Sequence, residues 1–153
     1  MTYIVAQLVG AYAGMLFSWL VLGHKDSLDL HPLTVNHSIG YVFLAEMLFS
    51  TLFQTVYLHA KIEKISPSPN FGLRAITMGI VQYANAGMIY YLTGGSLNAT
   101  VGFSAITFRA MVRKAGEASY ISFLPAYTFG PLVGAILAGA FTKFVAIPIA
   151  HMD

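Results

Sequence analysis

Long runs without charge dominate this sequence and limit what it can fold into. Met1–Gly23 and Tyr120–Thr142 carry no charged residue, and Ile39–Leu58 carries only Glu46. A further uncharged run extends from Ala75 to Phe108. A bilayer core of about 30 Å needs about 20 apolar residues per helix. The runs therefore predict an all-α integral membrane protein.

Composition excludes several other classes. Hydrophobic residues make up 57% of the chain and charged residues only 9%, against about 25% charged in average globular domains. The net charge of +2 is small and scattered, which argues against a nucleic-acid partner. Six spans would need roughly 120 residues and leave little for connections. The 153 residues therefore have room for four or five spans but not for six.

The uncharged run from Ala75 to Phe108 is too long for one span and too short for two spans joined by a turn. It is interrupted by Thr93–Asn98, whose Gly-Gly-Ser-Leu core is typical of a turn. We expect a full helix before this turn and a short one after it, of a length that suits a re-entrant half-helix. Broken backbone at membrane depth is tolerated only where protein buries it or where it lines a wet cavity.

The predicted architecture is one membrane domain over residues 1–153, with four transmembrane helices and one re-entrant half-helix. The spans are expected at about residues 3–22, 40–59, 73–92 and 120–144, and the re-entrant loop with its half-helix at about 93–113. Lysine and arginine are nearly balanced between the two sides, so the sequence leaves the orientation open.

Two of the runs are similar to each other. Leu8–Gly14 and Leu132–Gly139 both begin Leu-Val-Gly-Ala. This similarity indicates either an internal inverted repeat or the common composition of membrane helices. Small residues let two helices approach closely. The candidate packing positions are Gly10, Gly14, Gly130, Gly134 and Gly139.

Several motifs in order resemble the aquaporin and glycerol-facilitator family of major intrinsic proteins. Gly94–Thr100 after a span resembles the second Asn-Pro-Ala loop of that family. Tyr3–Ala11 resembles its third helix, Phe43–Glu46 its fourth and Phe129–Gly134 its sixth. The resemblance implies a truncated and degenerate member that covers helices three to six only. The first two helices and the first half-helix of the family have no counterpart in the sequence.

The pore motif departs from the family pattern. Asn98 is kept, but Ala99 stands where the family has proline, and Thr100 follows. Val101 stands where the family has the arginine of the selectivity filter, and Ala86 aligns with the filter histidine of water-selective members. A selective pore needs polar donors and charge at its constriction. The resemblance therefore implies a vestigial loop with two lost filter positions.

Two polar residues in the expected spans are candidate supports for the pore loops. The resemblance implies that Glu46 accepts hydrogen bonds from the loop N–H groups, although an intramembrane carboxylate could also serve a proton relay. The counterpart of Gln7 supports the loop that this sequence lacks, so Gln7 either bonds another subunit or is vestigial. Asn85 is expected to make interhelical hydrogen bonds.

No pattern in the sequence indicates catalysis or a metal. There is no cysteine, no catalytic triad or phosphate loop, and no metal-ligand spacing, so we expect neither an enzyme nor a cofactor. Bound lipids are expected instead. Tyrosines expected to include interfacial anchors are Tyr83, Tyr90, Tyr91, Tyr120 and Tyr127.

These features favour a non-conducting, aquaporin-like accessory subunit of a larger membrane complex, with an energy-converting, respiratory-type complex as one candidate. Its partners would be other membrane subunits and lipids that cover the open pore face, with no nucleic acid and no soluble small-molecule substrate. The alternative is a split or oligomeric channel for water or small neutral solutes. The membrane is not specified by the sequence, and the inner membrane of mitochondria is one hypothesis.

Overall fold

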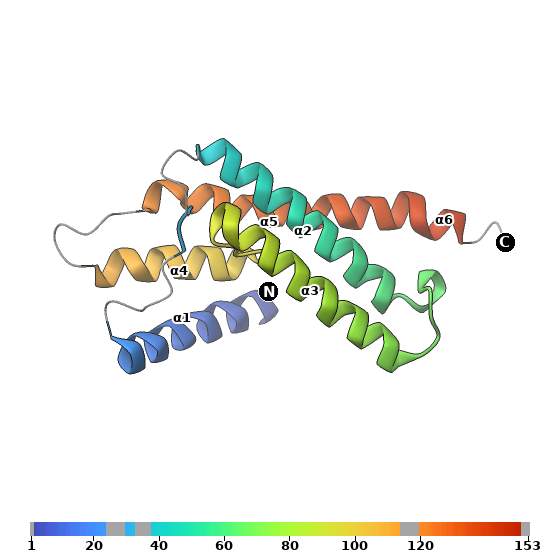
Figure 1. Cartoon of the computed structure of the whole chain (residues 1–153), viewed down its shortest axis with the longest axis horizontal. Helices are drawn as coiled ribbons and strands as arrows, with labels where there is room; N and C mark the ends of the chain where they lie inside the picture. The colour runs from blue at the N-terminus through green and yellow to red at the C-terminus, as the bar shows by residue number, and fades with distance from the viewer. Residues whose placement is uncertain (1, 24–29, 33–37, 114–119, 151–153) are drawn as a thin grey trace.

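The computed structural model describes residues 2–23, 30–32, 38–113 and 120–150. These residues form helices, turns and loops (Figure 1), which confirms the all-α class. The main helices are α1 (Thr2–Leu22), α2 (Ile39–Lys61), α3 (Phe71–Thr93), α4 (Ala99–Val112) and α5 (Leu124–Phe141). Shorter elements are the 3₁₀ turns Glu63–Ile65 and Ile121–Phe123, the π-helical turn Thr142–Ala146 and α6 (Ile147–Ile149).

Polar side chains set the starts of three helices. Ser38 Oγ accepts a hydrogen bond from the Tyr41 N–H, and Asn70 Oδ1 accepts one from the Leu73 N–H. Asn98 caps α4 in the same way. Such caps satisfy N–H groups that have no partner within the helix, so these helices begin close to where the sequence predicts.

Three helical stretches of the described chain are long and apolar enough to cross a bilayer. They are α1, α2 and the continuous stretch Ile121–Ile149. α3 is as long as α2, but it contains polar Gln82 and Asn85 and does not meet the same standard. The count of four spans therefore stays a prediction. α4 is also apolar, but it is shorter than these three stretches.

The last helical stretch ends later than the expected boundary at residue 144. After α5 the chain widens into the π-helical turn, in which the Ile147 N–H bonds the Thr142 carbonyl, and α6 follows to Ile149. A proline in a regular helix clashes with the carbonyl four residues earlier. The widened turn directly before Pro148 lets the helix continue past this residue.

Glycines bring α5 against α2, the most extensive helix pair in the chain. A Cβ atom built on Gly134 would lie 2.5 Å from the Met47 carbonyl oxygen and 2.9 Å from the Ser50 Cβ atom. One built on Gly130 would lie 3.0 Å from the Glu46 Cβ atom. Only glycine permits backbones this close, so two of the five predicted packing glycines hold this pair together.

α1 is covered far less than the other helices. It packs chiefly against α4, where the Tyr12 and Thr107 hydroxyls lie 2.6 Å apart, and Met15 is its only buried residue. Figure 1 shows α1 along one edge of the bundle beside α4. A Cβ atom on Gly10, Gly14 or Gly139 would meet nothing within 4 Å. Within the described residues no neighbour lies against these three glycines, so their role in helix packing stays a prediction.

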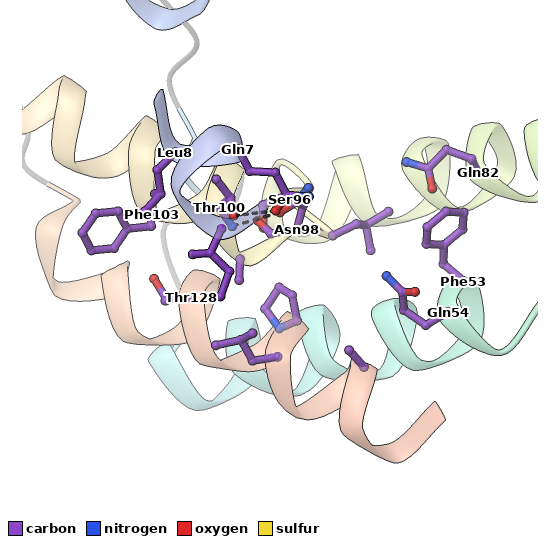
Figure 2. Close-up of a pocket in the computed structure, with 16 residues that line it drawn as sticks. Gln7, Leu8, Phe53, Gln54, Gln82, Ser96, Asn98, Thr100, Phe103 and Thr128 are labelled. Carbon is purple, nitrogen blue, oxygen red and sulfur yellow. Dashed lines mark hydrogen bonds between the residues drawn. The ribbon is translucent and has the colours of Figure 1, made fainter. Parts of the chain in front are cut away.

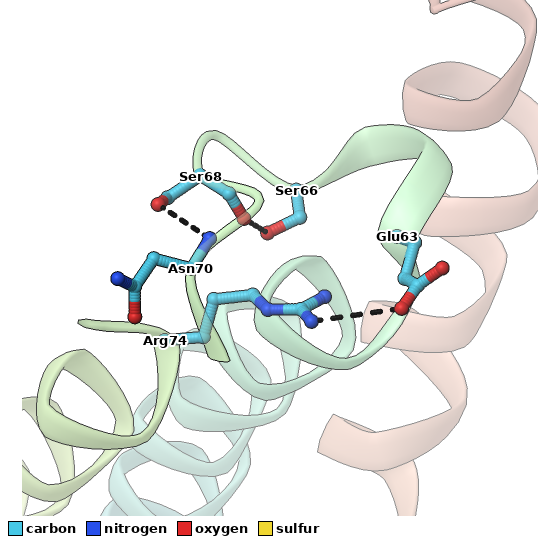
Figure 3. Close-up of polar contacts among 5 residues, drawn as sticks. All are labelled: Glu63, Ser66, Ser68, Asn70 and Arg74. Carbon is cyan, nitrogen blue, oxygen red and sulfur yellow. Dashed lines mark hydrogen bonds and ion pairs between the residues drawn. The ribbon is translucent and has the colours of Figure 1, made fainter. Parts of the chain in front are cut away.

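The connection between α2 and α3 is ordered by short-range polar contacts (Figure 3). Ser66 Oγ donates to the Ser68 carbonyl at 3.0 Å, and the Asn70 N–H donates to Ser68 Oγ at 3.2 Å. Arg74 in the first turn of α3 forms an ion pair with Glu63, with 3.6 Å between Arg74 Nη2 and Glu63 Oε1. These contacts fix the turn that sends α3 back alongside α2.

The α2–α5 contact predicts a difference between two glycine substitutions. Gly134→Ala should lower the free energy of unfolding by about 1–3 kcal/mol, as overpacking does. Gly139→Ala should be neutral or stabilise by up to about 1 kcal/mol through helix propensity, because its Cβ meets open space. The measurement is unfolding of the purified protein in detergent, followed by far-UV circular dichroism. Equal stability of the two variants would contradict the close approach of α5 to α2.

Candidate pore loop and half-pore cavity

A cavity of about 520 Å³ lies where α1, α2, α3 and α5 surround the loop and first turns of α4 (Figure 2). Apolar side chains such as Leu8, Phe53 and Phe103 form much of its wall. Its polar lining comes from all five helices and the loop: Gln7, Gln54, Gln82, Ser96, Asn98, Thr100 and Thr128. The cavity wall is thus partly apolar and partly polar, and it is centred on the segment that the sequence predicts to be re-entrant.

Unusual backbone angles turn the chain between α3 and α4. Gly94 ends α3 in the left-handed conformation, with φ of +80°, and its N–H bonds the Tyr90 carbonyl. Gly95 and Leu97 also have positive φ, of +67° and +50°. The left-handed region costs an L-residue roughly 1–2 kcal/mol, so Leu97 needs compensation from its surroundings. That compensation comes from a buried carboxylate.

Glu46 on α2 is fully buried and accepts hydrogen bonds from the loop with both oxygens. Its Oε1 accepts from Thr93 Oγ1 at 2.8 Å and from the Ser96 N–H at 3.0 Å. Its Oε2 accepts from the Leu97 N–H at 2.9 Å and from Ser96 Oγ at 3.2 Å. Hydrogen bonds to an ionised acceptor are about twice as strong as neutral ones. Glu46 therefore satisfies the loop N–H groups that have no helical partner.

Tyr127 on α5 holds the same segment through Thr93. Its hydroxyl donates to the Thr93 carbonyl, its backbone and Cβ atom pack against Gly102 of α4, and its side chain is fully buried. The Gly95 N–H in turn donates to Thr93 Oγ1 at 3.1 Å. Tyr127 is therefore not one of the interfacial anchors that the set of tyrosines is expected to include, because its side chain is buried and its hydroxyl finds a backbone acceptor.

Asn98 starts the half-helix and faces the cavity. Its Oδ1 accepts from the Thr100 N–H at 2.9 Å, and Ala99 takes the first helical position. The Gly102 N–H bonds the Asn98 carbonyl at 2.9 Å. The positive end of the α4 dipole thus points toward the cavity. Loss of the proline at Ala99 has not prevented the half-helix from forming.

Gln7 contacts this half-helix, a contact that the resemblance did not imply. Its Oε1 accepts from Thr100 Oγ1 at 3.4 Å, and Figure 2 shows both side chains at the cavity wall. Within the described residues Gln7 therefore contacts the first turn of α4, not a loop of another half. This contact and the Tyr12–Thr107 pair attach α1 to α4.

The two lost filter positions do not line the cavity. Ala86 is exposed on α3, and Val101 is 37% exposed on α4. Neither belongs to the residues that form the cavity wall. One turn away on α3, Gln82 does line it. Asn85 is buried, and its Nδ2 donates to the Phe49 carbonyl of α2 at 3.5 Å.

A family model for the major intrinsic proteins matches residues 1–142. The chain belongs to the major intrinsic protein family. This membership confirms the resemblance drawn from the loop and helix motifs, and it agrees with the aquaporin-like arrangement of apolar helices around a half-helix.

Among curated proteins, the chain is similar to a protein named Aquaporin C from Dictyostelium discoideum, with 27% identity over 151 residues. The match covers 92% of this chain but only 49% of that protein. The chain thus spans about half the length of the curated relative that it matches. No solved structure matches the chain.

Sequence reasoning missed three side chains that build the site. Thr93 and Ser96 bind Glu46 directly, and Tyr127 binds Thr93. The hydroxyl residues that flank Gly94-Gly95 were a usable signal, because serine and threonine in turns often bond nearby backbone. For Tyr127 the available signal was its place in the repeat, where it aligns with Tyr3.

The role of Glu46 predicts a large effect of Glu46→Gln. A carboxamide keeps one acceptor oxygen and turns an NH₂ group toward donors, so buried loop N–H groups lose their partner. The free energy of unfolding should fall by about 3 kcal/mol, measured by unfolding in detergent. Glu63→Gln is the matched control, because Glu63 is 85% exposed in its pair with Arg74 and should change stability by less than about 0.5 kcal/mol. Similar effects of the two variants would refute the anchoring role.

Proposed function

We propose that this major intrinsic protein is a non-conducting accessory subunit of a larger membrane complex. The observation that carries the proposal is the incomplete enclosure of the cavity. Its wall within the described residues contains one half-helix only, and on one side it is formed by α1, which has almost no buried surface. A conducting pore needs a closed, lined path, and this chain supplies part of one.

Polar side chains of the cavity wall also need a hydrogen-bond partner, from another protein or from water. Gln54 and Gln82 line the cavity and make no hydrogen bond within the described part of the chain. A polar group left without a partner in hydrocarbon costs several kcal/mol. Neighbouring membrane subunits are the partners that meet this need, and lipids cover the remaining apolar surface.

Loss of filter chemistry supports the same role. Ala86 and Val101 offer neither hydrogen-bond donors nor charge, and both lie outside the cavity wall. Selective conduction depends on such groups at a constriction.

Members of this family are channels and not enzymes, and nothing among the cavity residues argues for catalysis. The assembly that we propose for this chain is a respiratory-type complex in the inner mitochondrial membrane.

A split or oligomeric channel for water or small neutral solutes is the second candidate. One observation favours it: the loop is still fully held by Glu46 and Tyr127, and Asn98 still faces the cavity. In this hypothesis another chain would supply the other half of the wall. Flux measurements separate the two functions.

The accessory role predicts no water conduction by the purified chain. Proteoliposomes that contain it should shrink under an osmotic gradient at the rate of empty vesicles, measured by stopped-flow light scattering. Asn98→Leu, which removes the side chain at the loop, should leave that rate unchanged. A full-length conducting member of the family, reconstituted at equal density, is the positive control.

The same measurement can contradict the proposal. Water permeability several times that of empty vesicles, abolished by Asn98→Leu, would show that copies of the chain form a pore. Permeability that appears only in the intact native assembly, and disappears with Asn98→Leu there, would establish the split channel.

A further inference from the structure

Two serine–proline dipeptides form the connection between α2 and α3. The segment Ser66–Asn70 reads Ser-Pro-Ser-Pro-Asn, and none of its residues lines the cavity. It follows α2, one of the helices that are long and apolar enough to cross a bilayer, so it lies beyond the end of that span. Both prolines are exposed and both serines are partly exposed. A soluble enzyme can therefore reach this segment.

The backbone of the segment is extended, the conformation in which protein kinases bind the residues around an acceptor serine. Ser66 has φ of −72° and ψ of 131°, and Asn70 has φ of −76° and ψ of 114°. A residue before proline favours such angles. Proline-directed kinases present an apolar pocket to the residue after the acceptor, where the N–H of any other residue would be left without a hydrogen-bond partner. Both serine–proline dipeptides meet this requirement.

Hydrogen bonds distinguish the two serines as acceptors. Ser66 Oγ donates to the Ser68 carbonyl at 3.0 Å, and a phosphate on Ser66 would remove this donor. It would also adjoin the 3₁₀ turn that carries the Glu63 carboxylate, because the Ser66 N–H bonds the Glu63 carbonyl. Ser68 Oγ instead accepts from the Asn70 N–H at 3.2 Å (Figure 3). Phosphate oxygens are acceptors too, so the structure favours Ser68.

The start of α3 is suited to receive a phosphate on Ser68. The first turn of α3, which the structure describes in full, contains no acidic residue, and its cap is the neutral Asn70. The positive end of the helix dipole is therefore free of negative charge. Arg74 lies one helical turn after Asn70, because its N–H bonds the Asn70 carbonyl at 3.1 Å, and helical side chains lean toward the N-terminus.

The guanidinium of Arg74 has donors to spare. Its pair with Glu63 is long, at 3.6 Å, and the Glu63 side chain is 85% exposed. Arg74 Nε is buried and has no hydrogen-bond partner among the described residues. A guanidinium offers five N–H donors in a fork that matches phosphate oxygens. Arg74 can thus bind a phosphate at the start of its own helix.

We propose that Ser68 is phosphorylated by a proline-directed serine/threonine kinase, and that Arg74 and the N-terminus of α3 bind the phosphate. Ser68 Oγ attacks the γ-phosphorus of ATP, and the bond from that phosphorus to the bridging oxygen breaks to release ADP. The hydroxyl proton passes to the carboxylate base of the kinase. Arg74 then exchanges its pair with Glu63 for the phosphate, which orders the α2–α3 connection. This modification is independent of the accessory role.

Kinase labelling of the purified full chain in detergent tests the site. The probe is a mitogen-activated protein kinase with ATP labelled in the γ-phosphate, and mass spectrometry locates the phosphate. We expect it on Ser68. Pro69→Ala should lower its incorporation at least about tenfold, because the new N–H has no partner in the kinase pocket. The matched controls Pro67→Ala and Ser66→Ala keep Ser68-Pro69 intact and should be labelled as fully as the unmodified sequence.

The same variants, expressed in the source cells, test whether the modification occurs there. The chain is isolated from its own membranes with phosphatases inhibited, and a Ser68 phosphopeptide is expected that disappears with Pro69→Ala. Absence of this phosphopeptide, phosphate on Ser66 in its place, or labelling that Pro69→Ala leaves undiminished would overturn the site.

Phosphorus NMR of the labelled protein tests the role of Arg74. The phosphoserine should lose its last proton at a lower pH in the folded chain than in the denatured chain, because nearby positive charge stabilises the dianion. Arg74→Gln should move the midpoint toward that of the denatured chain. Lys61→Gln is the matched control, since Lys61 belongs to the same end of the bundle but contacts the Tyr57 hydroxyl. Equal midpoints in the folded and denatured chain, or equal effects of the two variants, would overturn the binding of phosphate by Arg74.

Discussion

The carboxylate of Glu46 makes broken backbone possible inside the helical bundle. Between Gly94 and Asn98 the chain makes no regular helix, and Leu97 adopts a left-handed conformation. Unpaired N–H groups at this depth would cost several kcal/mol each. Glu46 accepts from two of these N–H groups and from two hydroxyls, so the cost of burying its charge is offset by four hydrogen bonds. Without this acceptor, the Ser96 and Leu97 N–H groups and the Thr93 and Ser96 hydroxyls would lose these hydrogen bonds.

The glycines of α5 follow from the same constraint. Glu46 reaches the loop only if α2 lies deep in the bundle, and Gly130 and Gly134 allow α5 to approach the backbone of α2 at that level. α5 then brings Tyr127 to the Thr93 carbonyl. The loop is thus held by α2 through Glu46 and by α5 through Tyr127, and the two supports depend on each other through the contact between these helices.

The opposite side of the cavity has no such support within the described chain. α1 repeats the pattern of α5 without a partner corresponding to α2, and it is attached mainly to α4. A loop held by Glu46 and Tyr127 beside a largely exposed helix is the arrangement expected of a subunit whose second wall comes from elsewhere. This asymmetry, together with the apolar Ala86 and Val101, underlies the accessory role that we propose.

The sequence by itself determined the membrane class, the helix positions and the family. Uncharged runs require burial in lipid or protein, and Ser38, Asn70 and Asn98 cap helices through contacts between near neighbours in the chain. Contacts of this kind depend on local pattern and are therefore readable from sequence.

Only the tertiary structure decided which glycines pack and which face open space. Gly10 and Gly134 have the same neighbours in sequence, Leu-Val-Gly-Ala, yet one is exposed and the other lies against α2. It also decided that Tyr127 is buried and that the former filter positions lie off the cavity wall. Burial depends on which distant helix lies opposite a residue, and a local pattern that is identical in two places carries no information about that neighbour.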